Sequence, residues 1–156
     1  MVQTNVMRLL DQKKVPYRTA EYHVDESDLS GVHAAAELGM DPAMVFKTLV
    51  AKGEKKGYCV FCIPVAKELN LKKCAAAIGD KKIEMLPLKN LTAVTGYIRG
   101  GCSPVGMKKK YKTVISEDII LRDTVCVSGG KIGIQLEIAP EDLCRAADAT
   151  YADIVF

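Results

Sequence analysis

The strongest constraint on the fold is a pair of extended apolar segments joined by a short charged loop. Residues 45–51 read Val-Phe-Lys-Thr-Leu-Val-Ala, and residues 58–63 read Tyr-Cys-Val-Phe-Cys-Ile. Both segments are rich in the β-branched and aromatic residues that favour strands. The loop over residues 53–57 has a glycine at each end and three charged residues between them. This pattern predicts a β-hairpin.

Further helices and strands are expected on both sides of this hairpin. Capping residues and closing glycines predict helices over residues 4–14, 30–39 and 70–79, with others over 87–95 and 140–150. Extended segments are expected over residues 17–22, 113–115, 124–128 and 132–138. Several hairpins between helices favour an α+β fold, a mixed β-sheet or barrel with the helices packed outside.

Composition places the chain among soluble globular proteins. With 156 residues, 49% hydrophobic and 26% charged, it is expected to form one domain spanning residues 1–156. No apolar run reaches the roughly 18 residues typical of a membrane span, and the first residues lack a secretory pattern. Six cysteines without an export signal indicate free thiols in the cytoplasm. The formal net charge of +3 does not by itself indicate a nucleic-acid-binding protein.

Lys47 interrupts the first strand of the hairpin, which is otherwise apolar or β-branched. On an edge strand its ammonium group would simply point into water. On a central strand it must face a cavity or an anion, because an isolated buried ammonium group is too costly. In the second case Lys47 is placed to bind a phosphate, or to donate a hydrogen bond to an oxygen on which negative charge develops.

Residues 100–106, Gly-Gly-Cys-Ser-Pro-Val-Gly, form the second informative segment. Three glycines and a proline in seven residues describe a tightly shaped loop whose backbone N–H groups can point at a ligand. An ordinary turn has the same composition. Cys102 is a candidate reactive thiol without a neighbouring histidine. Ser128 precedes Gly129-Gly130 and is either a hairpin hydroxyl or a polar group at the rim of a cavity.

Cys59 and Cys62 have the spacing of a redox dithiol or of half a zinc site. A redox pair normally lies at a helix N-terminus, whereas this pair lies in a predicted strand, where residues three apart point to opposite faces. A zinc site needs a second pair of ligands, and His23 and His33 do not have that spacing. We therefore expect buried structural thiols, and no metal or cofactor.

Lys108, Lys109 and Lys110 directly follow the glycine-rich loop. A run of this kind is usually a solvated surface. Beside a ligand-binding loop it can instead contact phosphates, and the binding would then depend on salt concentration.

Together these segments resemble the YbaK/EbsC family, whose members are related to the editing domain inserted in bacterial prolyl-tRNA synthetases. The resemblance rests on residues 46–49, 64–66, 71–73, 96–106 and 127–131, together with Lys108 and Lys109. The segment from Gly-Tyr-Ile at residue 96 to Ser-Pro-Val-Gly at residue 106 is quite specific. In order and spacing the resemblance covers nearly the whole chain.

The resemblance implies a free-standing trans-editing deacylase that removes cysteine from tRNA(Pro), with some action on tRNA(Cys). In that family the strand lysine is the key functional residue and matches Lys47, and the glycine-rich loop that lines the aminoacyl ester matches Gly100, Gly101 and Pro104. The other predicted substrate-binding residues are Tyr22, Phe46, Cys102, Ser103, Ser128 and Gln135, and the predicted tRNA contacts are Lys108, Lys109 and Lys110. Family members often have an acid where this chain has Gln135.

Two mechanisms are compatible with the lack of a recognisable protein nucleophile. In the first, the thiol of the substrate cysteine attacks its own ester carbonyl, and the enzyme contributes proximity and orientation. In the second, common in related editing domains, a water molecule activated by the terminal ribose hydroxyl attacks, and other small amino acids such as alanine are accepted. The first predicts a lyase-type reaction and the second a hydrolase.

The resemblance also implies partners. Aminoacyl-tRNA is the expected substrate, prolyl-tRNA synthetase and cysteinyl-tRNA synthetase are the candidate protein partners, and neither DNA nor a membrane is expected. Two other classes of function are compatible with parts of the sequence. One is a non-catalytic module that binds tRNA or a synthetase, and the other is a thiol redox protein that uses Cys59 and Cys62.

Overall fold

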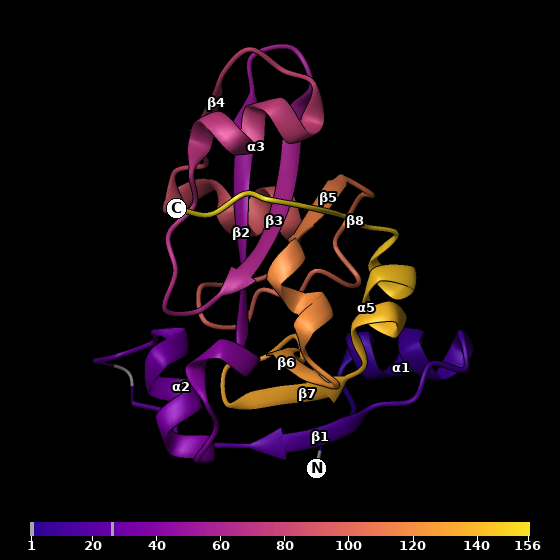
Figure 1. Ribbon diagram of the computed structural model, residues 1–156. Coiled ribbons are helices and arrows are strands. Elements are labelled where there is room, and N and C mark those ends of the chain that lie inside the picture. Colours follow the sequence, from indigo (N-terminus) through magenta and orange to yellow (C-terminus); the bar gives the residue numbers. More distant parts are fainter. Residues whose placement is uncertain (1, 26) are drawn as a thin grey trace.

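The computed structural model describes residues 2–25 and 27–156, and Figure 1 shows its elements. The α-helices are α1 (Asn5–Gln12), α2 (Gly31–Leu38), α3 (Leu71–Ile78), α4 (Leu91–Thr95) and α5 (Pro140–Ala147), and the short 3₁₀-helices are η1 (Pro42–Met44), η2 (Leu88–Asn90) and η3 (Glu117–Leu121). The strands are β1 (Arg18–Glu21), β2 (Phe46–Gly53), β3 (Gly57–Pro64), β4 (Ile83–Met85), β5 (Lys112–Ser116), β6 (Val125–Ser128), β7 (Ile134–Ile138) and β8 (Thr150–Ala152).

The strands form two sheets with the orders β4-β2-β3-β5-β8 and β1-β7-β6. The predicted hairpin is confirmed, because β2 and β3 pair antiparallel from Phe46 opposite Pro64 to Gly53 opposite Gly57. The larger sheet is mixed, since β3 and β5, and β5 and β8, pair in parallel. The predicted α+β class with a mixed sheet is therefore confirmed. The barrel alternative is wrong, because both sheets of the described chain remain open.

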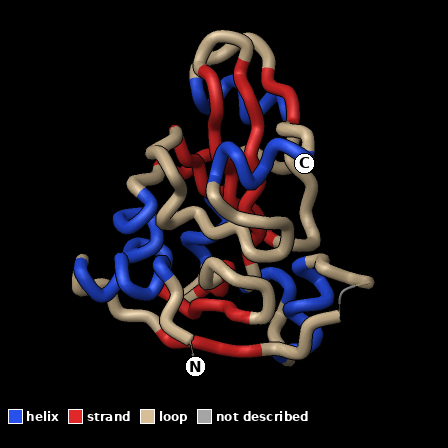
Figure 2. Tube along the Cα trace, turned by 180° about the vertical axis from the view of Figure 1, so that it is seen from behind, coloured by secondary structure: helices blue, strands red, loops and turns tan. Residues whose placement is uncertain are grey.

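The hairpin separates two parts of the hydrophobic core. Cys62 lies with α1, α5 and the smaller sheet in one buried cluster, whereas Phe61 and Ile63 lie with α3 in another. Successive side chains of a strand point to opposite faces, so β3 supplies both clusters. Figure 2, seen from behind, shows the long strands of the hairpin rising from the smaller sheet. The junction of the two sheets therefore lies near the start of β2.

Local signals in the sequence set most helix ends. The side chains of Thr4, Ser30 and Asn70 accept hydrogen bonds from the first-turn N–H groups of α1, α2 and α3, as predicted. The last helix is shorter than predicted. It ends at Ala147, because Asp148 adopts a left-handed conformation (φ 50°) that aspartate tolerates better than most residues. The residues that follow form β8 instead of a further turn of helix.

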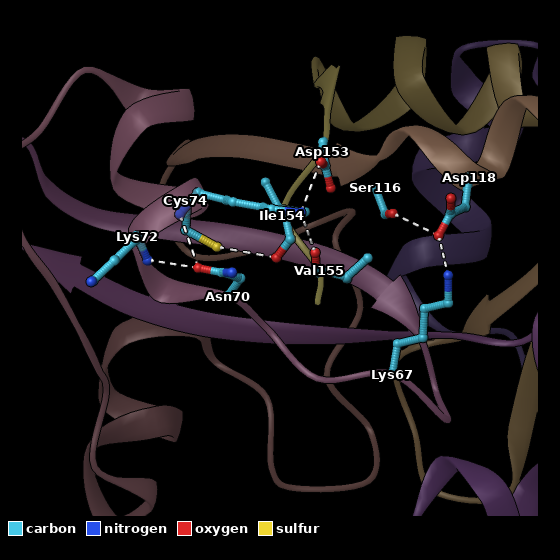
Figure 3. Close-up of polar contacts among 10 residues, drawn as sticks. Lys67, Asn70, Lys72, Cys74, Ser116, Asp118, Asp153, Ile154 and Val155 are labelled. Carbon is cyan, nitrogen blue, oxygen red and sulfur yellow. Dashed lines mark hydrogen bonds and ion pairs between the residues drawn. The ribbon is translucent and has the colours of Figure 1, made fainter.

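The C-terminal segment packs on the same face of the larger sheet as α3. The Cys74 thiol donates a hydrogen bond to the carbonyl of Ile154 over 3.7 Å, as Figure 3 shows. Nearby, the Lys67 ammonium group lies 2.8 Å from the Asp118 carboxylate, which also accepts from Ser116. These contacts occupy the face of the sheet that α3 covers. No helix within residues 2–25 and 27–156 has both the length and the apolar character needed to cross a membrane.

Candidate functional site

A cavity of about 400 Å³ lies where the two sheets meet. Its walls come from β2, the start of α2, the segment from Met85 to Leu91, the first part of the glycine-rich loop, and the ends of β6 and β7. The cavity exists because β2 has a free edge here. On this side Val45 bridges to Cys126, and pairing with β4 begins only at Ala51. The carbonyl of Val50 already accepts from the N–H of Leu86 on this side, so the free stretch of the edge lies between Val45 and Val50.

Lys47 lies on this free edge and lines the cavity. β2 is an interior strand of the sheet order, so the structure corresponds to the alternative in which the lysine must face a cavity or an anion. The side chain is half-buried, and no carboxylate of the described residues forms an ion pair with it. The ammonium group is therefore available to an anionic or electron-rich ligand.

The glycine-rich loop forms a second wall. Gly100 has a φ of +85°, and a Cβ there would lie 3.3 Å from Ile132, so both conformation and space favour glycine. A Cβ on Gly101 would lie 3.2 Å from the backbone nitrogen of Ile132. This close packing on the turn before β7 fixes the path of the loop. Gly100 and Cys102 line the cavity, whereas Gly101 lies behind it.

Two other predicted loop residues do not reach the cavity. Ser103 is fully buried, and its hydroxyl accepts a hydrogen bond from the backbone N–H of Val105, which shapes the loop. Pro104 lines a different, smaller cavity on the other side of the loop, together with Lys109 and Lys110. Lys108 is exposed and lines neither cavity. Of the predicted loop and lysine residues, Gly100 and Cys102 line the first cavity, whereas Pro104, Lys109 and Lys110 line the second.

The smaller sheet forms the third wall with Tyr22, Ser128 and Gln135. Ser128 lies opposite Gln135 in the pairing of β6 with β7, and its hydroxyl accepts from the N–H of Gly130 over 3.1 Å. Gln135 is only 6% exposed, and its side-chain oxygen Oε1 has no hydrogen-bond partner among the described residues. A buried acceptor without a donor costs about 1–3 kcal/mol. A ligand that brings a donor into the cavity would remove this cost.

The thiol of Cys102 is not set up as a nucleophile. It is 9% exposed, and burial raises its pKa to about 12, so the thiol is protonated at neutral pH. A protonated thiol is a poor nucleophile. Within the described residues, no group of three or more histidine, cysteine, aspartate or glutamate side chains could hold a metal ion. The chemistry available to the described cavity walls is hydrogen bonding and the positive charges of Lys47 and Arg99.

Cys59 and Cys62 are both fully buried and lie in different core clusters, so the prediction that they point to opposite faces of the strand is confirmed. Burial raises the pKa of Cys59 to about 11 and that of Cys62 to about 12. Reactive thiols need a lowered pKa. A redox role for this pair is therefore not supported by the geometry.

Replacing Cys59 and Cys62 together by alanine is expected to lower stability but not to change catalysis by more than several-fold. Each loss of a buried sulfur should cost roughly 0.5–3 kcal/mol of unfolding free energy, the usual range for a core substitution. Chemical denaturation, together with single-turnover rates of the deacylation that the family resemblance implies, measures the two effects. Complete loss of activity in a folded double variant would contradict this assignment.

Several cavity residues were not predicted from the sequence. Arg99 and Thr48 add polar groups, and Arg99 stands inside the recognised 96–106 segment, so its position was a usable signal. An apolar wall is formed by Leu49, Met85, Leu86, Leu88 and Leu91. Leu88 is 57% exposed in spite of its apolar side chain. Such a residue looks like part of an ordinary amphipathic helix until the fold places it beside a cavity.

Comparison with known proteins agrees with this architecture. The profile of the aminoacyl-tRNA editing domain matches residues 28–146. The candidate Cys-tRNA(Pro)/Cys-tRNA(Cys) deacylase EbsC of Enterococcus faecalis is 48% identical over 151 residues, which cover 97% of this chain and 92% of that protein. A proline–tRNA ligase of Thermosipho melanesiensis is 31% identical over 131 residues, which cover 76% of this chain but only 23% of the ligase.

Two solved structures share the fold. The hypothetical protein APE2540 superposes with a TM-score of 0.89 at 24% identity, covering 98% of this chain and 100% of the other. A candidate trans-editing enzyme for prolyl-tRNA synthetase gives a TM-score of 0.83 at 22% identity, with 99% of each chain covered.

The α+β fold with two open sheets is that of the small domains that edit charged tRNA. Residues 28–146 supply most of this architecture. The chain belongs to the aminoacyl-tRNA editing domain family. The predicted family, fold class and type of enzyme are therefore confirmed.

Proposed function

We propose that this protein is a trans-editing deacylase, acting as a single domain over residues 1–156, that releases cysteine from Cys-tRNA(Pro) and also from Cys-tRNA(Cys). The observation that carries the proposal is Lys47, which faces a cavity of about 400 Å³ and forms no ion pair with any residue the structure describes. The extensive similarity to the Enterococcus faecalis protein supports the choice of amino acid and tRNA.

The reaction begins when the sulfur of the substrate cysteine attacks its own ester carbonyl carbon. A carbon–sulfur bond forms, the bond from that carbon to the terminal ribose oxygen breaks, and the thiol proton passes to the departing ribose oxygen. Water then opens the cyclic thioester and gives free cysteine. The substrate supplies the nucleophile, so the enzyme contributes proximity, orientation and charge stabilisation.

The cavity walls have separate roles in this scheme. Lys47 orients the ester or binds the phosphate of the terminal nucleotide. The backbone N–H of Gly100, which lines the cavity, stabilises the negative charge that develops on the carbonyl oxygen. The N–H of Gly101 already donates to the carbonyl of Ile98, so Gly101 shapes the loop instead. Gln135 Oε1, which has no hydrogen-bond donor among the described residues, accepts a hydrogen bond from the substrate α-ammonium group. Tyr22, Phe46, Cys102 and Ser128 border the substrate.

The same proposal covers partners and location. The protein acts in the cytoplasm on aminoacyl-tRNA, and prolyl-tRNA synthetase or cysteinyl-tRNA synthetase supplies part of the tRNA selectivity. The similarity to part of a proline–tRNA ligase supports a relation to prolyl-tRNA selection. Co-sedimentation with each purified synthetase, with and without its tRNA, tests the partner.

A panel of charged tRNAs tests the proposed activity. We expect rapid release of cysteine from Cys-tRNA(Pro), slower release from Cys-tRNA(Cys), and slow reaction of alanyl- and prolyl-tRNA. Preferred hydrolysis of alanyl-tRNA would favour the mechanism with water activated by the ribose hydroxyl. No turnover of any charged tRNA, with or without a synthetase, would overturn the proposal and leave a binding module.

Gln135→Leu separates a substrate-binding role from a structural one. A hydrogen bond to a charged group contributes about 1.5–3 kcal/mol, so kcat/KM for Cys-tRNA(Pro) should fall roughly ten- to hundredfold. Stability should stay the same or rise, because the variant removes a buried acceptor that has no donor. Gln135→Glu, which keeps the acceptor oxygen, is the matched control. Unchanged kcat/KM in Gln135→Leu would exclude this contact.

A further inference from the structure

A second cavity of about 250 Å³ lies on the opposite side of the glycine-rich loop. Gly100 and Cys102 line the first cavity, and Pro104 and Gly106 line the second. Cys102 and Pro104 are two residues apart, so their Cα atoms are separated by at most about 7 Å. One short segment therefore forms a wall of both cavities.

The loop is held in this position by its own packing. Gly106 has a φ of +81°, and a Cβ there would lie 2.8 Å from the Tyr97 hydroxyl oxygen. That hydroxyl donates to the carbonyl of Val105. The buried Ser103 Oγ accepts a hydrogen bond from the Val105 N–H in the same segment. These contacts hold the loop in place, so the distance between the two cavities is fixed by the fold.

Lysines from separate elements surround the second cavity. Lys13 closes α1, and Lys109 and Lys110 precede β5. α1 and α5 lie side by side (Figure 1), and the Lys13 ammonium group donates to the carbonyl of Ala146 in α5 over 3.1 Å. Lys110 pairs with Asp148, whereas Lys109 forms no ion pair with any described residue. The cations come together only in the folded chain.

The balance of charge in this region is strongly positive. Asp148 is the acidic residue of the cavity wall, and its pKa is lowered, chiefly by the hydrogen bond and charge of Lys110 and further by Lys13 and Lys112. Lys13, Lys110 and Lys112 lie close enough to act on this carboxylate, and Lys109 lines the same cavity. Four cations against the one described carboxylate leave an excess of three positive charges. This equals the formal net charge of the whole chain, +3. A field of this kind attracts anions to one place.

The neutral polar groups of the cavity are already used. The Tyr111 hydroxyl donates to the carbonyl of Val94 over 2.7 Å, and the Thr113 hydroxyl donates to the carbonyl of Tyr111 over 3.0 Å. Among the described residues of this wall, the side-chain donors left for a ligand are the lysine ammonium groups. The cavity is therefore suited to an anion rather than to a neutral polar molecule.

We propose that this second cavity, the Lys13/Lys109 site, binds backbone phosphates of the tRNA acceptor strand whose esterified 3′ end occupies the first cavity. The inference rests on the proposed function, because a ligand with a phosphate chain behind an ester can occupy both sides of the loop at once. Because the loop fixes the distance between the two cavities, it also fixes how far the bound phosphates lie from the ester at the 3′ end. The site thus selects an RNA-linked ester over a free amino acid ester.

The test measures binding of an uncharged acceptor-stem minihelix RNA over a range of salt concentrations. Lys13→Gln with Lys109→Gln should flatten the slope of log Kd against log salt by about 1.4–1.8, and weaken binding roughly twentyfold at 0.15 M salt. Lys55→Gln with Lys56→Gln is the matched control, because it removes the same charge at the far end of the β2–β3 hairpin (Figure 1). Thermal unfolding verifies that each variant is folded.

A variant that makes the site more positive provides the opposite test. Asp148→Asn removes the carboxylate and keeps a residue that tolerates the left-handed backbone there, so it should bind the RNA several-fold more tightly. Unchanged Kd and salt slope in the Lys13/Lys109 variant, an equal loss in the Lys55/Lys56 control, or no gain in Asp148→Asn would each overturn the site. The deacylation panel is read separately, so an active wild type without these effects leaves the proposed function intact.

Discussion

Lys47→Ala is expected to abolish release of cysteine from Cys-tRNA(Pro) while leaving the protein folded. The loss should be at least a hundred- to a thousandfold in single-turnover rate, the range found when one charge-stabilising donor is removed from an active site. Stability should change little, because no described carboxylate pairs with this lysine and none is left buried without its partner. Thermal unfolding and quench-flow deacylation measure the two quantities.

Two further variants make this result specific. Lys52→Ala is the matched control, since Lys52 lies on the same strand but is exposed beside the Tyr58 ring, and its activity should equal that of the wild type. Lys47→Arg should also be strongly impaired if the reaction needs a compact ammonium group, because guanidinium differs in shape and hydration. Full activity in folded Lys47→Ala would remove Lys47 from the site.

The second large effect concerns the substrate. Seryl-tRNA(Pro) should be deacylated at least a hundredfold more slowly than cysteinyl-tRNA(Pro), although the two esters have nearly the same shape. A thiol with a pKa of about 8.5 supplies a few per cent of thiolate at neutral pH, whereas a serine hydroxyl supplies essentially none. The difference should therefore lie in the chemical step and not in binding.

Single-turnover rates at saturating enzyme separate the chemical step from binding. The rate for the cysteinyl substrate should rise with pH up to about the thiol pKa of 8.5, roughly tenfold per pH unit. A folded enzyme that deacylates both esters at equal rates would exclude attack by the substrate thiol and would favour water. The hydroxyl of the terminal ribose would then be the group to replace, with 2′-deoxyadenosine at the tRNA end.

The parts of the fold with strong local signals were predictable. The β2–β3 hairpin follows from its two apolar runs and its glycine-bounded loop, and α1, α2 and α3 begin at side chains that cap them. The parallel pairing of β3 with β5 was not predicted, because the two strands are separated by long connecting segments. Pairing between distant segments depends on the packing of the whole chain, which no local pattern encodes.

The candidate site shows the same division. Lys47 was identifiable because a cation in an apolar strand conflicts with burial, and that conflict marks a site. The apolar wall near Leu88 and the second cavity beside Lys13 gave no such signal. In the sequence Lys13 is an ordinary exposed residue at the end of a helix. Only the packing of α1 against α5 brings it near Lys109 and Asp148.

The free edge of β2 also bears on solubility. An unpaired strand edge is a template on which another chain can add a strand, and proteins suppress this with short edges and inward-pointing charges. Here the free stretch is confined between the Val45 bridge and Val50, and Lys47 lies within it. Lys47 is therefore an inward-pointing charge of the kind that opposes the addition of another strand to this edge, and we expect Lys47→Ala to aggregate more readily than the wild type as well as to lose activity.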